Sequence, residues 1–488
     1  VTSEVDPFAK TGGLADVSAA LPRHLSRAGH DVRVFVPFYS RVAERGAPGL
    51  ATVDFIRDVE VWLGPHRYAF SLVTAPLPGS DAPVYFVHCP PLYARPAIYT
   101  ADPDEHRRFL LLCRAALDSA QRMGFAPDIV HCNDWQSGML PLMLKVNYGW
   151  DRLFAGTKTV LTIHNLMYQG TFSADILAET GLAGAANLLH QEQLRAGRIG
   201  FLLTGLLYAD VLTTVSPTYA REIQTPEHGA GLHEFLRARA DHLVGILNGV
   251  DDAWDPATDL LIPFRYSATD LAPKEGNKRA LLEAMGLHYT PGVPAIGIVS
   301  RLASQKGLDL ALEVLPDVLA RWKARLVVLG SGERRLEEGF AALQRALPGK
   351  VGFFNGFQPK LAHLVEAGAD IFLMPSRYEP CGLNQMYSLR YGTVPVVRKT
   401  GGLADTVAPY DPRTGEGTGF VFEHFDQAGL RWALEAALKT YDDKTRWRRL
   451  QHNGMAEDFS WDAQGRRYEA LYAALCGLGP ARAPAQRE

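Results

Sequence analysis

Short apolar runs alternate with longer segments of helical period along the first half of the chain. The runs have the length and composition of buried strands, and they cover residues 32–36, 129–131, 159–163 and 211–215. Residues 21–28, which precede the first run, and residues 106–123, which separate the first two, place apolar side chains at helical spacing. This alternation is typical of a parallel, doubly wound α/β sheet.

The same alternation begins again in the second half of the chain. Further apolar runs cover residues 296–299, 326–329, 351–354 and 371–374, and a helix-like stretch follows each of them. Pro256, Pro263 and Pro273 interrupt the pattern between the two halves. We therefore predict two Rossmann-like α/β domains, residues 1-250 and 251-460, that face each other across a cleft. The tail from Gly477 is rich in Ala, Pro, Gly and Arg, and is predicted to be frayed.

Composition excludes several classes of protein. The chain has 488 residues with 47% hydrophobic and 21% charged residues, which is typical of globular proteins and too long for one core. Its net charge of -3 gives no electrostatic reason to bind nucleic acid or an anionic membrane. A small molecule or a neutral polymer is the better expected partner.

Cysteine usage and the N-terminal residues bear on the compartment. The five cysteines are widely spaced and form no C-x-x-C pair, which predicts neither a disulfide framework nor a zinc site. Glu4 and Asp6 stand where a secretory peptide would need basic residues. The longest apolar stretch, residues 201–215, contains Asp210 and is shorter than the ~20 residues of a membrane span. We expect a cytoplasmic protein without a membrane segment.

A carboxylate follows the apolar run 371–374 on a turn that contains Pro380 and Gly382. This residue is Glu379, and a second Gly-rich turn, Thr400-Gly401-Gly402, follows the apolar run 394–397. Loops at the carboxyl ends of strands form the ligand crevice of open α/β sheets. Glu379 is therefore a candidate site residue.

Two cations follow the run 296–299. Arg301 and Lys306 lie on a strand-to-helix connection, where helix N–H groups and positive side chains together suit a diphosphate. The alternative interpretation is a solvated basic pair at the start of a surface helix.

A further Gly-rich loop, Lys10-Thr11-Gly12-Gly13, precedes a predicted helix that contains Asp16. Its glycines allow a ligand to approach the backbone, although a tight turn would explain them equally. The loop lacks P-loop spacing, and Gly330-Ser331-Gly332 lacks the third glycine of the dinucleotide motif because Arg335 stands there. The sequence therefore argues against Walker-type ATP hydrolysis and against NAD chemistry.

Polar side chains close two strands of the first half. Asp134 follows the run 129–131 and His164 follows the run 159–163, so both are expected near the crevice edge, either as site residues or as structural polar groups. Metal binding by His131, Asp134 and His164 has no compact ligand spacing to support it, and we predict no metal.

Taken together and in this order, the motifs resemble those of bacterial glycogen synthases and plant starch synthases, family 5 of the glycosyltransferases. The resemblance runs from about Val1 to about Tyr472 and rests on residues 10–16, 162–165, 248–251, 300–301, 306–307, 379–383 and 400–403. It implies the GT-B fold, no cofactor, and a helix within residues 461-488 that crosses back to the first domain. The implied reaction is retaining transfer of glucose from ADP-glucose to the non-reducing end of an α-1,4-glucan such as glycogen.

The resemblance also implies roles for individual residues. Arg301 and Lys306 are expected at the donor diphosphate, Glu379 and His164 beside the transferred glucose, and Asp134 near the acceptor and the reacting carbon. Tyr378 is expected beside the nucleotide base, and Tyr99 is a looser match to a tyrosine near the adenine. The full set of expected substrate-binding residues is Lys10, Thr11, Gly12, Gly13, Asp16, Tyr99, Asn248, Tyr378, Cys381, Gly382, Leu383, Thr400, Gly401 and Gly402.

The implied chemistry depends on charge placement. Negative charge builds on the diphosphate as the glycosidic bond breaks, and fixed cations stabilise it by roughly a few kcal/mol per well-placed group. Retention can follow from front-face attack or from double displacement through a carboxylate. The family expectation is front-face attack, with Glu379 as a positioning and electrostatic residue.

The chain departs from the family pattern at two positions. Gln136 follows Trp135 where many relatives carry His, and Tyr387 stands where the second Glu of an E-x7-E arrangement would fall.

Three other classes of protein remain open. A glucan phosphorylase would share the fold but needs a pyridoxal phosphate lysine and a far longer chain. A sucrose synthase-like transferase would keep Arg301, Lys306 and Glu379 with another acceptor, whereas a silent glucan-binding protein would be free to lose all three.

Overall fold

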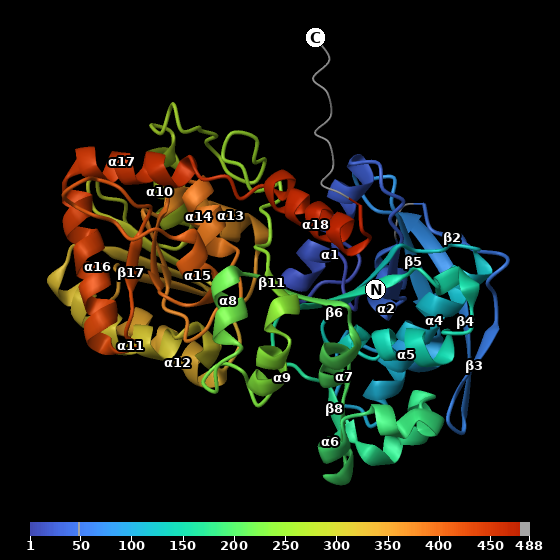
Figure 1. Cartoon of the computed structure of the whole chain (residues 1–488). Coiled ribbons are helices and arrows are strands. Elements are labelled where there is room, and N and C mark those ends of the chain that lie inside the picture. Colours follow the sequence, from blue (N-terminus) through green and yellow to red (C-terminus); the bar gives the residue numbers. More distant parts are fainter. Residues whose placement is uncertain (47–48, 479–488) are drawn as a thin grey trace. The chain divides into compact units, whose positions relative to one another are not determined.

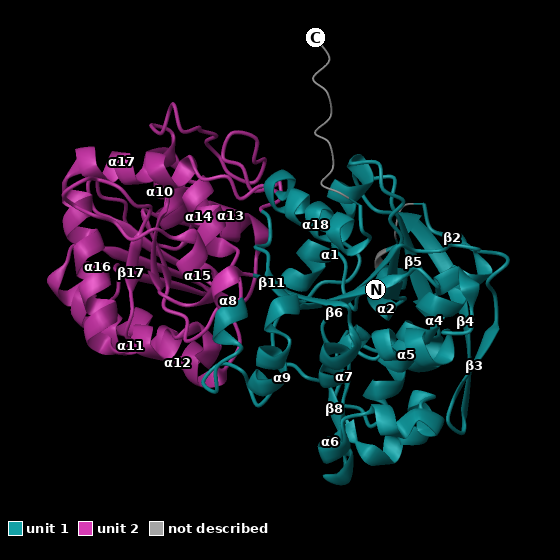
Figure 2. Ribbon diagram, in the orientation of Figure 1, with its two compact units in different colours: residues 1–215, 220–249, 461–488 teal, residues 216–219, 250–460 magenta. Residues whose placement is uncertain are grey.

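The computed structural model describes residues 1–46 and 49–478, and the chain forms two compact units (Figure 1, Figure 2). Unit 1 contains residues 1–215, 220–249 and 461–488, and unit 2 contains residues 216–219 and 250–460. Most of the tail that the sequence predicts to be frayed, residues 479–488, lies outside the described residues. No helix in the described part of the chain is long and apolar enough to cross a bilayer.

Unit 1 contains a parallel sheet and a mixed sheet. The parallel sheet has the order β11-β10-β7-β6, and the mixed sheet has the order β1-β5-β4-β2, with β3 paired to β4. The strands are β1 (Val34–Pro37), β2 (Ala51–Thr52), β3 (Val59–Leu63), β4 (His66–Pro76), β5 (Pro83–His88), β6 (Ile129–Asn133), β7 (Lys158–Ile163), β10 (Val211–Thr214) and β11 (Leu243–Gly245), with a small pair β8 (Thr171–Ser173) and β9 (Arg198–Gly200).

The helices of unit 1 pack around these sheets. They are α1 (Gly13–Arg27), α2 (Ser40–Arg45), α3 (Pro90–Tyr93), α4 (Glu105–Arg122), α5 (Leu140–Asn147), α6 (Gln191–Arg195), α7 (Phe201–Tyr208), α9 (His233–Ala238) and α18 (Trp461–Leu475), and α8 (Pro217–Glu222) contains residues of both units. In one apolar cluster, Val17 and Leu21 of α1 lie with Trp461 and Tyr468 of α18, which joins the last helix to the first.

The hairpin of β3 and β4 differs from the purely parallel pattern that the sequence predicts. Strand β4 is antiparallel to β2, β3 and β5. Strand β3 alternates buried and exposed residues, because an antiparallel strand can face solvent on one side. Such a strand lacks the continuous apolar run by which the buried parallel strands were recognised.

The first residues of the chain lie between the two sheets of unit 1. The backbone N–H of Thr2 donates to the carbonyl of Phe35 on β1 at 3.0 Å. The amino group of Val1 donates to the carbonyl of His131 on β6 at 2.7 Å. This segment thus connects β1 to β6, although it is not itself regular strand.

Unit 2 is built on one six-stranded parallel sheet. Its order is β14-β13-β12-β15-β16-β17. The strands are β12 (Ala295–Val299), β13 (Arg325–Gly330), β14 (Val351–Asn355), β15 (Ile371–Met374), β16 (Val394–Arg398) and β17 (Phe420–Phe422). The helices are α10 (Lys274–Ala284), α11 (Leu308–Arg321), α12 (Arg334–Ala346), α13 (Pro359–Gly368), α14 (Asn384–Arg390), α15 (Gly401–Thr406), α16 (Gln427–Asp442) and α17 (Lys444–Met455).

Two apolar clusters cover the two faces of this sheet. On β13, Leu326 and Val328 belong to a cluster with residues of α11, α12 and α16. Val327 and Leu329 belong to a cluster with residues of α10 and α13. Successive residues of a strand point to opposite faces, so this division is the signature of helices on both sides of the sheet.

The strand order of unit 2 reverses between β12 and β15. From β12 the chain continues outward through β13 to β14, whereas from β15 it continues the other way through β16 to β17. Loops at the carboxyl ends of the two central strands therefore diverge there. Such a switch point is where open α/β sheets bind ligands.

Candidate functional site

The switch point of unit 2 brings Lys306 and Glu379 together. Lys306 follows β12 and Glu379 follows β15, and the Lys306 Nζ lies 2.6 Å from the Glu379 Oε2. The hydroxyl of Ser376 donates to the same oxygen at 3.0 Å. Glu379 is only 5% exposed, so this buried carboxylate is held by an ion pair and a hydrogen bond.

Two glycines let the surrounding loops approach one another closely. Gly307 has a φ of 65°, and a Cβ there would lie 1.9 Å from the carbonyl oxygen of Pro375. Gly401 has a φ of 44°, and a Cβ there would lie 1.9 Å from the carbonyl oxygen of Glu379. A side chain at either position would meet both strained backbone and a backbone atom. The loops after β12, β15 and β16 therefore fit together only with glycine at these two positions.

The other predicted residues of unit 2 lie on the same three loops. The exposed Arg301 follows β12, and the half-buried Tyr378 immediately precedes Glu379. Cys381 is buried, and its carbonyl accepts from the Gln385 side chain at 3.0 Å, which ties the start of α14 to this loop. The remaining predicted residues on these loops are Gly382, Leu383, Thr400, Gly401 and Gly402.

These loops can bind an anion and stabilise negative charge. Gly307 is the N-cap of α11, a helix of 14 residues whose amino end carries partial positive charge. Arg301 and Lys306 flank the entry to that helix. Two side-chain cations beside a helix amino end form an arrangement suited to a diphosphate.

A second group of predicted residues lies in unit 1 around Glu4, which the sequence analysis did not single out. The Glu4 Oε1 accepts hydrogen bonds from the hydroxyls of Thr11 and Tyr99, each at 2.6 Å. Its Oε2 accepts from the backbone N–H groups of Thr11 and Gly12. Glu4 is 2% exposed, so one buried carboxylate fixes the Gly-rich loop and the tyrosine.

These contacts change the interpretation of the Gly-rich loop in unit 1. The N–H groups of Thr11 and Gly12 bind the chain's own carboxylate, and Lys10 forms ion pairs with Asp16 and Asp6. The loop was expected either to let a ligand approach its backbone or to form a tight turn, and its two amides already donate to Glu4. In the sequence, Glu4 is merely an acidic residue upstream of the loop, and no motif marks it as a partner of the loop.

Asp134 and His164 are in contact at the carboxyl ends of β6 and β7. The backbone N–H of His164 donates to the Asp134 Oδ1 at 2.7 Å. Asp134 has a φ of 55°, which is rare for a residue with a side chain and is often found at functional sites. Gly13 is the first residue of α1, and Asn248 follows β11 with a buried Oδ1 that has no hydrogen-bond partner among the described residues.

Burial shifts the pKa values of Asp134 and His164 in the directions that favour their neutral forms. It raises the pKa of the Asp134 carboxyl to about 7, to which the negative charge of Glu4 also contributes. It lowers the pKa of the His164 imidazole to about 3. His164 is therefore neutral near pH 7. The side-chain N–H of Asn133 donates to the carbonyl of Val1, so the Asn133 Oδ1 faces the His164 ring at 2.9 Å from its Nε2. Because an amide oxygen only accepts, the proton of the neutral imidazole is on Nε2.

The two departures from the family pattern are both buried. Gln136 belongs to a short 3-10 helix after β6. Tyr387 stacks on the ring of Trp254, with centroids 4.1 Å apart and an angle of 4° between the planes. Where the E-x7-E arrangement would have a second carboxylate, this chain has an aromatic stack.

No cluster of three or more His, Cys, Asp or Glu side chains that could hold a metal occurs among residues 1–46 and 49–478. The five cysteines are free thiols.

Comparison with known proteins identifies relatives of both units. Residues 1–238 match the family model described as starch synthase catalytic domain, and residues 290–452 match glycosyl transferases group 1. Glycogen synthase from Geotalea uraniireducens is 46% identical over 481 residues, which is 97% of each chain. Glycogen synthase from Myxococcus xanthus is 48% identical and covers 97% of this chain and 98% of its own.

A solved structure is similar over nearly the whole chain. It is the catalytic domain of starch synthase IV from Arabidopsis thaliana bound to ADP and acarbose, with a TM-score of 0.89 and 34% identity over 97% of this chain and 98% of that one. Sucrose-phosphate synthase from Thermosynechococcus elongatus, at 18% identity and a TM-score of 0.61, shares the fold.

Proposed function

The chain belongs to the glycogen and starch synthase family of glycosyltransferases, and from that premise we propose that it transfers glucose from ADP-glucose to the non-reducing end of an α-1,4-glucan, with retention and release of ADP. The predicted GT-B fold is confirmed by the same comparisons. The observation that carries the proposal is the Lys306–Glu379 pair at the switch point of unit 2, with Arg301 on the same loop as Lys306.

Arg301 and Lys306 stabilise the leaving diphosphate. The charge on the ADP phosphates increases as the bond to glucose breaks, and both cations lie where the helix dipole of α11 also favours an anion. Lys306 is held by Glu379 before the donor arrives, so little reorganisation is needed during the reaction.

Glu379 holds Lys306 and Ser376 in position, and its negative charge stabilises the positive charge that develops on the sugar. Its Oε2 is engaged by both Lys306 and Ser376, and this engagement weakens it as a nucleophile. The contacts therefore favour front-face attack over double displacement. In that mechanism the departing phosphate accepts the proton of the attacking glucan hydroxyl.

His164 and Asp134 serve the sugar side of the reaction. The neutral His164 ring binds sugar hydroxyls without adding charge near the positive sugar. Asp134, held by the N–H of His164, orients the acceptor. Thr11, Gly12 and Tyr99, which Glu4 holds in place, line the donor side together with Lys10, Gly13, Asp16 and Asn248.

The nucleobase has two aromatic candidates in unit 2. Tyr378 is the residue that the family resemblance implies. Phe357 follows β14 and is 73% exposed, and sequence reasoning missed it because only the fold shows that its apolar ring faces water. ADP is proposed over UDP because the similar starch synthase IV domain binds ADP. A cytoplasmic location is proposed because free, scattered cysteines suit a reducing compartment.

The proposal is tested by incorporation of radiolabelled glucose into glycogen from ADP-glucose and from UDP-glucose. We expect incorporation from ADP-glucose, and we expect Glu379→Ala to reduce it by about 100-fold or more, as for loss of a key electrostatic group. Glu338→Ala is the matched control, because Glu338 pairs with Arg334 at 2.7 Å on exposed α12. Folded wild-type protein that incorporates glucose from neither donor would contradict the proposal.

A further inference from the structure

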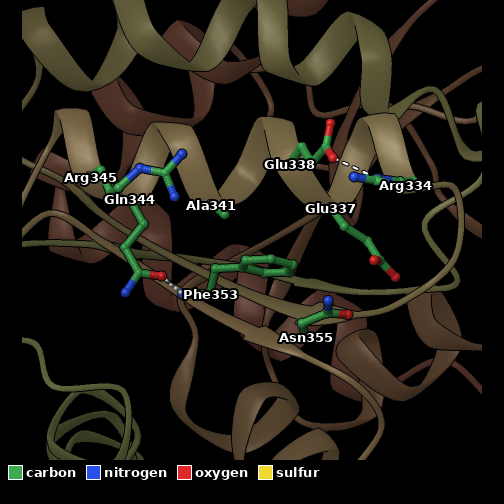
Figure 3. Close-up of a pocket in the computed structure, with 8 residues that line it drawn as sticks. All are labelled: Arg334, Glu337, Glu338, Ala341, Gln344, Arg345, Phe353 and Asn355. Carbon is green, nitrogen blue, oxygen red and sulfur yellow. Dashed lines mark hydrogen bonds and ion pairs between the residues drawn. The ribbon is translucent and has the colours of Figure 1, made fainter.

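Two surface grooves occur in unit 2 outside the loops described above. Figure 3 shows the first, which lies between α12 and β14 and has a volume of about 550 Å³. Several of its polar side chains are bound within the protein: Arg334 donates to Glu338 at 2.7 Å, and Gln344 accepts from the N–H of Phe353 at 3.0 Å. Because these groups are already engaged, this groove is a weaker candidate for a ligand site than the second one.

The second groove lies along β17 and the start of α16 and has a volume of about 460 Å³, within the range of ~300–1,000 Å³ that is typical of ligand sites. We call it the α16–β17 groove. The side chains that line it include those of Lys399, Pro409, Val421, Glu423, His424 and Trp432.

Trp432 gives this groove a broad apolar surface. Leu430, Ala433 and Leu434 of α16 are buried against the sheet of unit 2. Trp432 lies on the other side of the helix and is 60% exposed. An indole ring kept in water leaves a large apolar area uncovered, and here that area borders a groove.

The polar side chains of the groove suit an uncharged ligand that carries hydroxyl groups. Lys399 pairs with Glu423 at 2.6 Å, so one cation and one anion offset each other. Both side chains are more than half exposed, and the exposed His424 follows Glu423. A phosphate would meet the carboxylate, whereas sugar hydroxyls can both donate to Glu423 and accept from Lys399.

The backbone around the groove is held in place without a ligand. The N–H of Lys399 donates to the carbonyl of Phe422 at 2.8 Å, which joins the end of β16 to β17. The Asp426 carboxylate caps α16 by accepting from the N–H of Gly429 at 2.7 Å. A preformed site loses less entropy when it binds.

We propose that the α16–β17 groove binds a segment of α-1,4-glucan chain, with Trp432 stacked on a sugar ring and the Lys399–Glu423 pair bound to hydroxyls. This inference rests on the proposed function, which makes such a glucan the acceptor. Lys399 directly precedes Thr400 of the candidate donor loops, so the groove begins beside them. A second contact with a polymer raises the effective concentration of its chain ends at the catalytic site.

The experiment compares a long and a short acceptor in the full chain. Trp432→Ala is expected to raise the KM for glycogen by about tenfold, equivalent to ~1.4 kcal/mol, and to remove retardation in a native gel that contains glycogen. Transfer to maltotriose is expected to stay within about twofold of wild type, because a trimer is too short to occupy the groove and the catalytic site together. Trp432→Tyr keeps an aromatic ring and is expected to restore most of the glycogen affinity.

Trp62→Ala is the matched control, because Trp62 is 56% exposed on β3 of unit 1 and does not line the groove. Unchanged glycogen KM and gel mobility in Trp432→Ala would overturn the proposal. An equal loss of transfer to glycogen and to maltotriose would also overturn it, since the substitution would then act on the catalytic site or the fold. If folded wild type transfers glucose to neither glycogen nor maltotriose, the proposed function fails, and gel retardation still decides whether the groove binds glucan.

Discussion

At the scale of single residues, the buried carboxylates divide into those that the sequence indicated and those that it did not. Glu379 was predicted because it lies on the Pro/Gly turn that follows an apolar run. Glu4 was missed because its partners Thr11 and Tyr99 lie 7 and 95 residues away, and only the fold brings them together. Sequence motifs identify residues that are marked by their neighbours in the chain. Residues that act through contacts distant in sequence become apparent only in the structure.

Asp134 carries a pH dependence of stability that can be isolated. Burial raises the pKa of its carboxyl from 3.8 to about 7. The folded state therefore retains a proton that the unfolded chain has lost, so this group's contribution is present below pH 4 and is lost as the pH rises to about 7. A shift of roughly three units corresponds to ~4 kcal/mol. Asp134→Asn is expected to remove this loss of stability at higher pH. Urea unfolding of the wild type and of Asp134→Asn, each at pH 5 and at pH 8, would measure it.

The comparison with the variant cancels the contributions of all other carboxylates. The stability of Asp134→Asn relative to wild type is expected to increase between the two pH values. A difference that stays constant from pH 5 to pH 8 would mean that Asp134 is ionised in the folded protein throughout this range.

At the scale of elements, most of the parallel strands were predicted, whereas β5, β11, β17 and the antiparallel β3–β4 hairpin were not. Runs 296–299, 326–329, 351–354 and 371–374 lie on β12, β13, β14 and β15, because strands covered by helices on both faces are apolar almost throughout. Burial alternates along β3 and along part of β4, and neither strand has the long apolar run that marked the buried parallel strands. The strand order that creates the switch point also comes only from the structure.

Gly401→Ala tests whether the fit between the loops after β15 and β16 controls activity. The new methyl group would press on the carbonyl of Glu379 and displace the carboxylate that pairs with Lys306. We expect kcat to fall by about 100-fold, a size typical of misplaced electrostatic groups, as measured by initial rates with ADP-glucose and glycogen.

Gly286→Ala is the matched control for this substitution. Gly286 has a φ of 68°, and a Cβ there would meet no atom within 4 Å. It therefore bears a similar backbone cost of roughly 1 kcal/mol in stability, without the clash. If both variants lost activity to the same degree, backbone strain alone would explain the loss, and the contact with Glu379 would be irrelevant.

At the scale of the whole molecule, the chain order and the compact units do not coincide. Residues 461–478 follow unit 2 in the sequence, yet α18 packs with α1 in unit 1. The imidazole of His131 on β6 lies 2.6 Å from the hydroxyl of Tyr472, so the last helix also reaches the parallel sheet of unit 1. From the residues alone, α18 reads as one more amphipathic helix, and its attachment to α1 was expected only through the family resemblance.

Because unit 1 and unit 2 have separate apolar cores, we expect a cavity in one unit to destabilise that unit alone. Tyr468 on α18 is fully buried beside α1, and Tyr468→Ala is expected to cost about 3–5 kcal/mol, as for other large-to-small changes at aromatic positions. Hydrogen exchange followed by mass spectrometry should show faster exchange in α1, α18 and β6, with little change in the sheet of unit 2.

Phe340→Ala, which opens a cavity in the apolar cluster on α12, should show the reverse pattern. Faster exchange across both units in either variant would mean that the two cores unfold as one cooperative whole, because local cavities report on the size of the cooperative unit.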